Sequence, residues 1–354
     1  MWAELQAFCR SPAMSAAART TRRVVPNSAG QCVTANSVSV IVCTWNRSAS
    51  LRQTLLSLNE QIGCEGGPVE VIVVDNNSSD DTKSVVDSFL PHWKLGDLRY
   101  AFEQIQGKQF ALNHGIRIAR NAILAFTDDD VIFRSDWIRQ ARLAFDDATL
   151  DLAGGKTLLM WPDGGPPSWF APDMSAVAGG LDLGEARLDP PPPGYAPAGA
   201  NLIARRALFD RVGLYSEAHF RHMDYEFGLR CVNAGAHVAY DPGLVVHTPV
   251  ARATITKRYF RRWSFKAGIA ADGTGTEAAP SILFVPRWVY RRWVEDLIFL
   301  LPRLLATDDS AVFSRELRLW RSSGIIMSLW HAKLRPRSHG SWVEKYSQKV
   351  KDVY

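Results

Sequence analysis

Short apolar runs alternate with amphipathic stretches along the chain from residue 37 onward. Four runs are predicted to be buried strands, at residues 38–43, 69–75, 98–103 and 122–130. Each is almost continuously apolar, which is typical of strands covered on both faces. The stretches between the runs repeat apolar residues at helical spacing, as at Leu51, Leu55 and Leu58.

Strands that alternate with helices predict an α/β fold with a mostly parallel sheet and helices on both faces. The right-handed rule for crossover connections makes this sheet doubly wound. Further helical patterns occupy residues 204–212 and 223–234, before an apolar strand that ends at His247.

Two segments depart from this alternation within or before the predicted domain. Residues 1–36 contain four arginines and one acid without a sustained period, so they are expected to be a disordered extension, with a targeting peptide or a later start at Met14 as alternatives. Residues 160–198 are rich in Gly and Pro and are predicted to form a lid-like loop, since long irregular stretches are uncommon in compact domains unless functional.

Residues 255–354 are basic and aromatic, with Trp and Arg interleaved on predicted helices. This pattern suits a helical region that lies in a membrane interface, and equally a helical appendage that packs on the preceding domain. Both interpretations stay open at this point.

Composition indicates the charge of a partner and the cellular compartment, but it does not indicate a particular function. A net charge of +5 and a sequence pI near 9.0 favour an anionic partner of some kind. The five cysteines are scattered without metal-ligand spacing, which indicates free thiols in a reducing compartment. No apolar run reaches the roughly 18 to 20 residues that span a bilayer. We therefore expect a cytoplasmic protein, or one attached peripherally to the inner face of the plasma membrane.

Three consecutive carboxylates, Asp128, Asp129 and Asp130, end the fourth predicted strand. Their mutual repulsion would raise their pKa values unless a cation neutralised them. Mg²⁺ or Mn²⁺ is the expected cation, because such ions take carboxylate and phosphate oxygens, and open α/β sheets bind ligands at the carboxyl ends of their strands. The alternative is a solvated acidic turn before a helix near Ser135.

Asp75 also ends a predicted strand, where its carboxylate could accept hydrogen bonds from a base or a ribose. Ser78 or Ser79 is expected to cap the following helix, with Asp80 and Asp81 in its first turn.

In this order, the motifs resemble glycosyltransferase family 2, the inverting nucleotide-sugar enzymes with a GT-A fold. The resemblance runs from about Val38 to Lys266 and rests first on "VSVIVCTWNR", "VEVIVVDNNSSDDT" and "GKQFALNHGIRIARNAILAFTDDDV". It implies a donor site for a nucleotide diphosphate sugar, formed by Thr44, Asn46, Arg47, Asp75, Lys108, Asn113, Asp128 and Asp129. It also implies a DxD metal motif at Asp128 and Asp130, which would hold Mg²⁺ or Mn²⁺.

The acceptor side of the resemblance rests on "AGANLIARRALFDRVGLY" and "HMDYEFGLRCVNAG", which assign the catalytic base to Asp224. Here the chain departs from the family, because Met223 replaces a common acid and Glu226 replaces the second aspartate. Glu226 stands four residues before Arg230, the favourable order for a helical ion pair. Asp224 could instead cap this helix. His247 is either a further metal ligand or a histidine at the edge of the core.

The resemblance implies a nucleotide-binding half at 37–130 and an acceptor half at 131–254. The acceptor would be a saccharide or a lipid-linked saccharide in cell-surface polysaccharide or glycolipid biosynthesis. "YFRRW" is similar to a motif of processive members, but Tyr259 occupies its glutamine position, so a processive synthase is not expected.

Competing functions lack their motifs. A nucleotidyltransferase would be expected to carry a Gly-rich phosphate loop after the first strand, where this chain has "TWNRSAS". The GxGxxG motif of a dinucleotide-dependent oxidoreductase does not occur, and a P-loop does not occur either. A non-enzymatic module that binds membranes or nucleic acid is supported only by the basic C-terminal region, and nucleic acid is not an expected partner.

Overall fold

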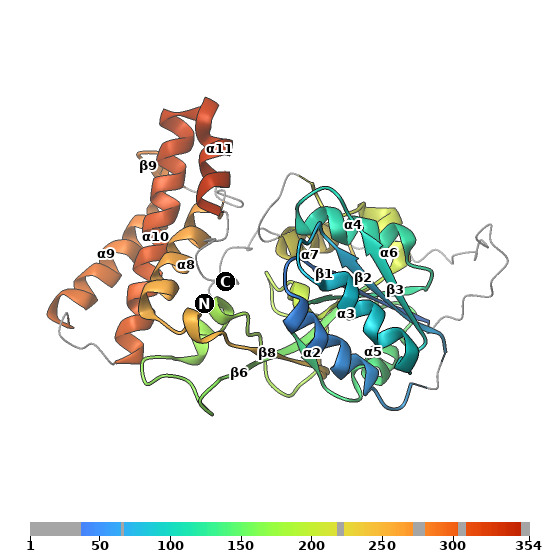
Figure 1. Ribbon diagram of the computed structural model, residues 1–354. Helices are drawn as coiled ribbons and strands as arrows, with labels where there is room; N and C mark the ends of the chain where they lie inside the picture. The colour runs from blue at the N-terminus through green and yellow to red at the C-terminus, as the bar shows by residue number, and fades with distance from the viewer. Residues whose placement is uncertain (1–36, 65–66, 218–222, 272–279, 304–308, 348–354) are drawn as a thin grey trace.

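The computed structural model describes residues 37–64, 67–217, 223–271, 280–303 and 309–347. The extension predicted at 1–36 lies outside these residues. The described chain consists of a sheet flanked by helices and, beside it, a bundle of C-terminal helices (Figure 1).

The described residues form an eight-stranded mixed sheet in the order β3-β2-β1-β4-β7-β6-β8-β5. The strands are β1 (Val38–Thr44), β2 (Val69–Asp75), β3 (Asp97–Phe102), β4 (Ile123–Asp128), β5 (Ile132–Phe133), β6 (Leu152–Met160), β7 (Leu202–Arg205) and β8 (Val238–Pro249). The first four in the sheet order are parallel, whereas β7 pairs antiparallel with both β4 and β6. The four predicted strands and the predicted fold class are confirmed.

Helices cover both faces of the sheet. On one face lie α2 (Ser48–Asn59), α3 (Thr82–Phe89) and α5 (Trp137–Ala144), which share a core with the inner side chains of β1 and β2. On the other face lie α4 (Lys108–Ile118), α6 (Arg206–Val212) and α7 (Met223–Asn233). Figure 1 shows the two layers on opposite sides of the strands. The near-continuous apolar strands are explained, because both of their faces are buried.

The sequence analysis missed β6, whose apolar run is interrupted by glycine and lysine. A side chain at Gly155 would place its Cβ 2.1 Å from the carbonyl oxygen of Leu244, so only glycine permits the close approach of β8. Lys156 is buried, with its ammonium group bound to Glu185 and 3.5 Å from Asp182. The glycine and the lysine are therefore explained by contacts with residues that are distant in the sequence.

The Gly/Pro segment 160–198 is packed rather than free. It contains the 3-10 helix η3 (Pro172–Ala178), and the ring of Trp169 lies 5.1 Å from that of Phe260 and 5.2 Å from that of Phe313. Ser314 donates a hydrogen bond to Asp173. The ring of Trp169 therefore fastens the segment to helices of the C-terminal region.

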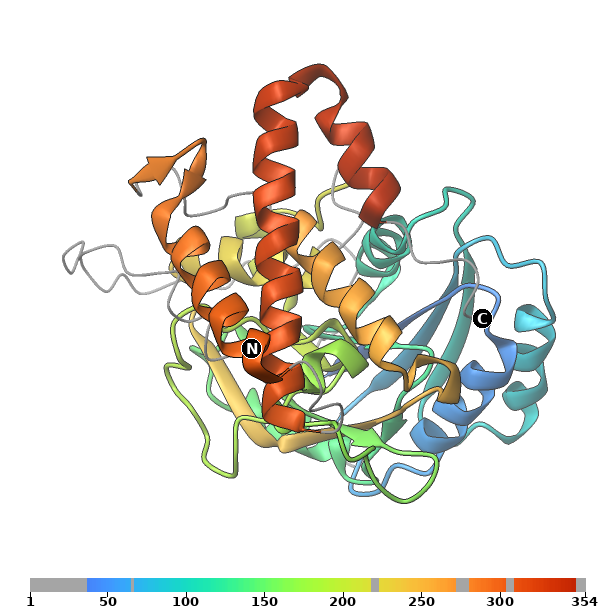
Figure 2. The ribbon, with the colours of Figure 1, turned by 90° about the vertical axis from the view of Figure 1, so that its left-hand side faces the viewer.

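The C-terminal bundle consists of α8 (Lys257–Ile269), α9 (Arg287–Leu300), α10 (Ser310–Leu334) and α11 (Pro336–Ser347). A short hairpin of β9 (Ser281–Ile282) and β10 (Val285–Pro286) precedes α9 (Figure 2). Asp296 of α9 is fully buried and pairs with Arg315 and Arg318 of α10. Over the described residues, none of the helices is both long and apolar enough to span a bilayer.

Helices α8 and α10 approach closely at a pair of glycines. A Cβ added at Gly324 would lie 2.2 Å from the carbonyl oxygen of Phe265. We expect Gly324→Ala to lower the free energy of unfolding by about 1 to 3 kcal/mol, because the helices must separate. Gly340→Ala in α11 is the matched control: nothing lies within 4 Å of its added Cβ, so only helix propensity changes and stability should rise slightly. Thermal unfolding of both variants checks this, and equal stabilisation by both would contradict it.

Candidate functional site

The acidic triplet lies at the carboxyl end of β4, next to the end of β1, with the end of β2 one strand further along the sheet. Arg47, at the start of α2, places Nη1 2.7 Å from Asp130 Oδ2 and 3.1 Å from Asp129 Oδ1. Lys108, the first residue of α4, donates to Asp128 Oδ1. Two basic side chains of the chain therefore offset part of the negative charge of the triplet.

The three carboxylates differ in exposure. The side chain of Asp129 is 6% exposed, against 33% for Asp128 and 36% for Asp130. Burial raises the pKa of Asp129 to about 6, the charge of Asp130 adds to this rise, and Arg47 opposes it. Asp128 and Asp130 are thus the two members of the triplet that can reach a ligand, and the predicted donor contact of Asp129 has little exposed surface to support it.

Asp224 lies in the first turn of α7 and contacts a distant segment. Its Oδ2 accepts a hydrogen bond of 2.8 Å from the Gly199 N–H, and its Oδ1 accepts one of 2.9 Å from the Tyr225 N–H. The adjacent Ala200 carbonyl accepts from the hydroxyl of Thr127, directly before the triplet. Two hydrogen bonds and a short stretch of backbone therefore join Asp224 to the end of β4.

The charges of these groups interact. Burial would lower the pKa of Lys108, but the carboxylate of Asp128 raises it above its ordinary value, and Asp224 adds to this effect. Lys108 therefore stays protonated beside Asp128.

Glu226 faces away from this site, as its helical position two residues after Asp224 predicts. Its carboxylate forms a two-pronged ion pair with Arg230, with N···O distances of 2.9 and 3.2 Å. Arg230 also donates to the carbonyl oxygen of Leu214. The predicted ion pair is confirmed, and Glu226 has a structural role.

Asp75 ends β2 with both carboxylate oxygens engaged. Oδ1 accepts from the Ser78 N–H at 2.9 Å, and Oδ2 accepts from the Tyr100 hydroxyl at 2.8 Å. Tyr100 was missed by sequence reasoning, because only the register of β3 against β2 brings it to Asp75. Burial raises the pKa of Tyr100, and its hydrogen bond to Asp75 raises it further. The Tyr100 hydroxyl therefore stays protonated and holds the carboxylate in place.

The turn after β1 fits the turn after β2. Asn46 has a positive φ of 51°, donates its N–H to Ser78 Oγ and accepts from the Ser79 N–H. The predicted cap at Ser78 or Ser79 is wrong, since α3 begins at Thr82, whose N–H donates to Asp80. The two serines instead connect the two turns. Thr44 is buried at the end of β1, opposite Asp75.

Asn113 is almost completely buried in α4. Its Nδ2 donates to the carbonyl oxygen of Tyr215, and its Oδ1 accepts from the N–H of the same residue, both at 3.0 Å. The amide of Asn113 is thus engaged by the backbone of Tyr215, which favours a positioning role over direct contact with the donor. The residue positions the segment that precedes α7.

We therefore expect Asn113→Ala to lower stability by about 1 to 3 kcal/mol, because two backbone groups of Tyr215 lose their partners. Donor affinity should stay near the wild-type value. Thermal unfolding and calorimetry on one preparation check both parts. A loss of affinity without a loss of stability would restore the direct contact.

His247 lies on β8, where its backbone is paired with that of Ile132 in β5. Among the described residues, the possible ligand atoms of Asp128, Asp130 and His247 do not gather within 4.8 Å of one another. This geometry favours the interpretation of His247 as a residue at the edge of the core.

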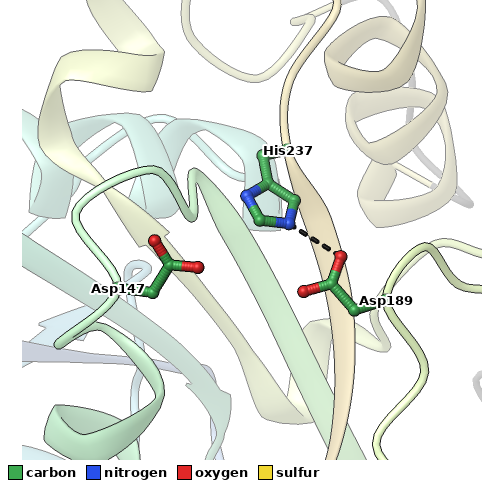
Figure 3. Close-up of side chains that lie close together, drawn as sticks. All are labelled: Asp147, Asp189 and His237. Carbon is green, nitrogen blue, oxygen red and sulfur yellow. Dashed lines mark hydrogen bonds and ion pairs between the residues drawn. The ribbon is translucent and has the colours of Figure 1, made fainter.

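One described cluster with metal-ligand atoms lies elsewhere, formed by Asp147, Asp189 and His237 (Figure 3). His237 directly precedes β8, which runs in the same direction as β4, so the cluster lies at the edge of the sheet opposite to the triplet. Nε2 of His237 is 2.7 Å from Asp189, and Nδ1 is 3.0 Å from the Thr149 hydroxyl. Both ring nitrogens have protein partners, so the cluster is satisfied without a metal.

The segment of the chain that contains these strand ends is similar to known proteins. Residues 39–160 match the family model described as glycosyl transferase family 2. Glycosyltransferase AglE of Haloferax volcanii is 32% identical over 128 residues, which cover 36% of this chain and 41% of the relative. The GalNAc(5)-diNAcBac-PP-undecaprenol beta-1,3-glucosyltransferase of Campylobacter jejuni is 38% identical over 96 residues, covering 26% and 29%. The chain spans less than half the length of either relative.

A solved structure shows the same fold. The mannosyltransferase PcManGT from Pyrobaculum calidifontis, in complex with GDP-Man and Mn²⁺, superposes with a TM-score of 0.51 at 16% identity. The match covers 88% of this chain and 84% of that protein. The fold of this chain is thus that of GT-A glycosyltransferases, as predicted.

Proposed function

From the match of residues 39–160 to glycosyl transferase family 2, we propose that the chain is a member of this family and an inverting, metal-dependent glycosyltransferase. It would transfer a sugar from a nucleotide diphosphate sugar to a hydroxyl group of an acceptor. The observation that carries the proposal is the convergence of Asp128, Asp130, Lys108 and Asp224 at the carboxyl end of β4.

Each group has a role in such a transfer. Asp224 would accept the proton of the acceptor hydroxyl as that oxygen attacks the anomeric carbon, while the bond from this carbon to the diphosphate oxygen breaks. Lys108 and Arg47 would stabilise the negative charge on the departing diphosphate. Asp75, held by Tyr100, would accept hydrogen bonds from the nucleoside, with Thr44 and Asn46 shaping the adjoining turn.

The donor set suits a divalent metal. Asp128 and Asp130 present partly exposed carboxylate oxygens, the ligands that Mg²⁺ and Mn²⁺ take together with substrate phosphates. A bound ion would supply Lewis-acid stabilisation of the diphosphate charge. The Mn²⁺ in PcManGT supports this choice of ion.

For the acceptor, we propose a saccharide or a lipid-linked saccharide, as in cell-surface polysaccharide or glycolipid biosynthesis. The Campylobacter relative is named for an acceptor linked to undecaprenol through a diphosphate, which supports the lipid-linked class. We extend the proposal to a cytoplasmic location with peripheral contact between residues 255–354 and an anionic membrane surface. The supporting observation is the number of large apolar side chains exposed on this bundle.

A screen of nucleotide diphosphate sugars tests the central claim. Calorimetric binding with Mn²⁺ and with a chelator should identify one donor that binds only with metal, and this donor names both the base and the sugar. Binding of no diphosphate sugar, or release of inorganic diphosphate from a nucleoside triphosphate, would instead point to a nucleotidyltransferase.

A further inference from the structure

The hairpin before α9 presents large apolar side chains to solvent at its turn. Ile282, Leu283 and Phe284 are 47%, 67% and 52% exposed. We call these three residues the hairpin tip. Such exposure of consecutive apolar residues on a projecting element marks a site of interaction.

The backbone conformation of the turn makes large apolar residues unusual at these positions. Leu283 and Phe284 form a two-residue turn with φ values of 47° and 69°. Turns with two positive φ values strongly favour Asn-Gly, because bulky residues are strained there. The turn geometry alone therefore does not explain Leu and Phe, and their apolar character needs another reason.

Apolar and basic side chains of α10 surround the hairpin tip. Trp330 donates its indole N–H to the carbonyl oxygen of Leu283 and is 41% exposed. Lys333 places its ammonium group 5.5 Å from the ring centre of Phe284. Leu334, one residue further, is 72% exposed. The tip is thus an apolar point with an indole and a cation beside it.

The described charged residues that flank the hairpin tip and the end of α10 along the chain are basic. Residues 280–291 and 327–340 contain no Asp or Glu, whereas Arg287, Lys333, Arg335 and Arg337 are basic and exposed. An anionic bilayer matches both features, since apolar side chains can enter below the phosphate level while Lys and Arg stay among the phosphates. Tryptophan is favoured at this boundary because its ring is apolar and its N–H is polar.

We propose that the hairpin tip inserts into the headgroup region of an anionic lipid bilayer and anchors the C-terminal bundle there. This inference rests on the peripheral membrane contact proposed above and adds the element that makes it. The fastening of segment 160–198 to α8 and α10 would then hold the catalytic sheet at a set position relative to the lipid surface.

Flotation of the full chain with phosphatidylcholine vesicles, with and without phosphatidylglycerol, tests the proposal. The key variant is Leu283→Asn with Phe284→Gly, because Asn-Gly suits this turn and keeps the hairpin folded. We expect the wild-type chain to float with anionic vesicles and the variant to partition at least about tenfold less, since each buried Leu or Phe contributes about that factor. Lys333→Gln with Arg335→Gln should reduce the preference for anionic vesicles.

The matched control is Ile62→Asn with Leu90→Asn, which removes two exposed apolar side chains from the catalytic part and should float as the wild type does. Equal flotation of the tip variant and the wild type, or no flotation of the wild type, overturns the proposal. A wild-type dimer in light scattering that becomes a monomer in the tip variant, without flotation, would show that the tip binds a second copy instead.

Donor binding measured on the same preparations separates this inference from the proposed activity. If the chain binds a nucleotide sugar but no vesicles, only the proposal that the hairpin tip inserts into a bilayer is wrong. If the chain binds vesicles through the tip but no nucleotide sugar, only the glycosyltransferase proposal is wrong.

Discussion

Asp224→Asn should lower turnover by at least about a hundredfold, because general base catalysis typically contributes 10² to 10⁴-fold. An asparagine oxygen can still accept the hydrogen bond from the Gly199 N–H, so the link between α7 and the segment after residue 198 is retained, while the Tyr225 N–H loses its acceptor. What the variant lacks is the ability to take a proton. Its affinity for the donor, measured by calorimetry, should therefore stay close to that of the wild type.

Glu226→Gln provides the matched control for this prediction. Glu226 lies in the same turn of α7, but its carboxylate binds Arg230 rather than the site. Loss of this ion pair should reduce stability modestly and leave turnover nearly unchanged. Turnover of Asp224→Asn at the wild-type level would remove Asp224 as the base, and equal loss in both variants would indicate a structural effect of the helix.

Asp130→Ala should weaken donor binding in the presence of Mg²⁺ or Mn²⁺ by about a hundredfold, since metal stabilisation of phosphate charge is worth several kcal/mol. Without metal, the same substitution should have the opposite effect on donor affinity. It removes one negative charge beside Asp129 and leaves the cation of Arg47 less neutralised. With a chelator present, donor affinity should therefore be equal to that of the wild type or slightly higher.

Calorimetry with and without the metal separates these two effects. Asp81→Asn is the control, because Asp81 is an exposed acid before α3 and its loss changes net charge without touching the triplet. If the wild type bound its donor equally well with metal and with chelator, the predicted metal role of Asp128 and Asp130 would be wrong.

The parallel half of the sheet could be predicted because its information is local. Strands β1, β2, β3 and β4 are short apolar runs, and the helices between them show apolar residues at helical spacing. In a parallel sheet the carboxyl ends of such strands lie at one edge. The sequence alone thus placed Asp75 and the acidic triplet at the same edge, and the family resemblance added Arg47 and Lys108 beside them.

The second half could be predicted only in part: α6, α7 and β8 follow local helical and apolar patterns, but β6 and the packing of segment 160–198 do not. Strand β6 contains Gly155, which leaves room for Leu244, and Lys156, which pairs with Glu185. These partners are distant in the sequence and contact β6 only after folding. The packing of segment 160–198 could not be predicted either, because nothing in the sequence showed that Phe260 and Phe313 would receive Trp169.

The sequence by itself determined the fold class, the strand ends that form the site, and the acidic residues gathered there, since periodicity and strand polarity are properties of local chain segments. Only the tertiary structure decided which of these groups have partners. It assigned Arg47 and Lys108 to the triplet, Tyr100 to Asp75 and Asn113 to the backbone of Tyr215. The physical reason is that hydrogen bonds and ion pairs depend on distances of a few ångströms between residues far apart in the chain, which no pattern along the sequence records.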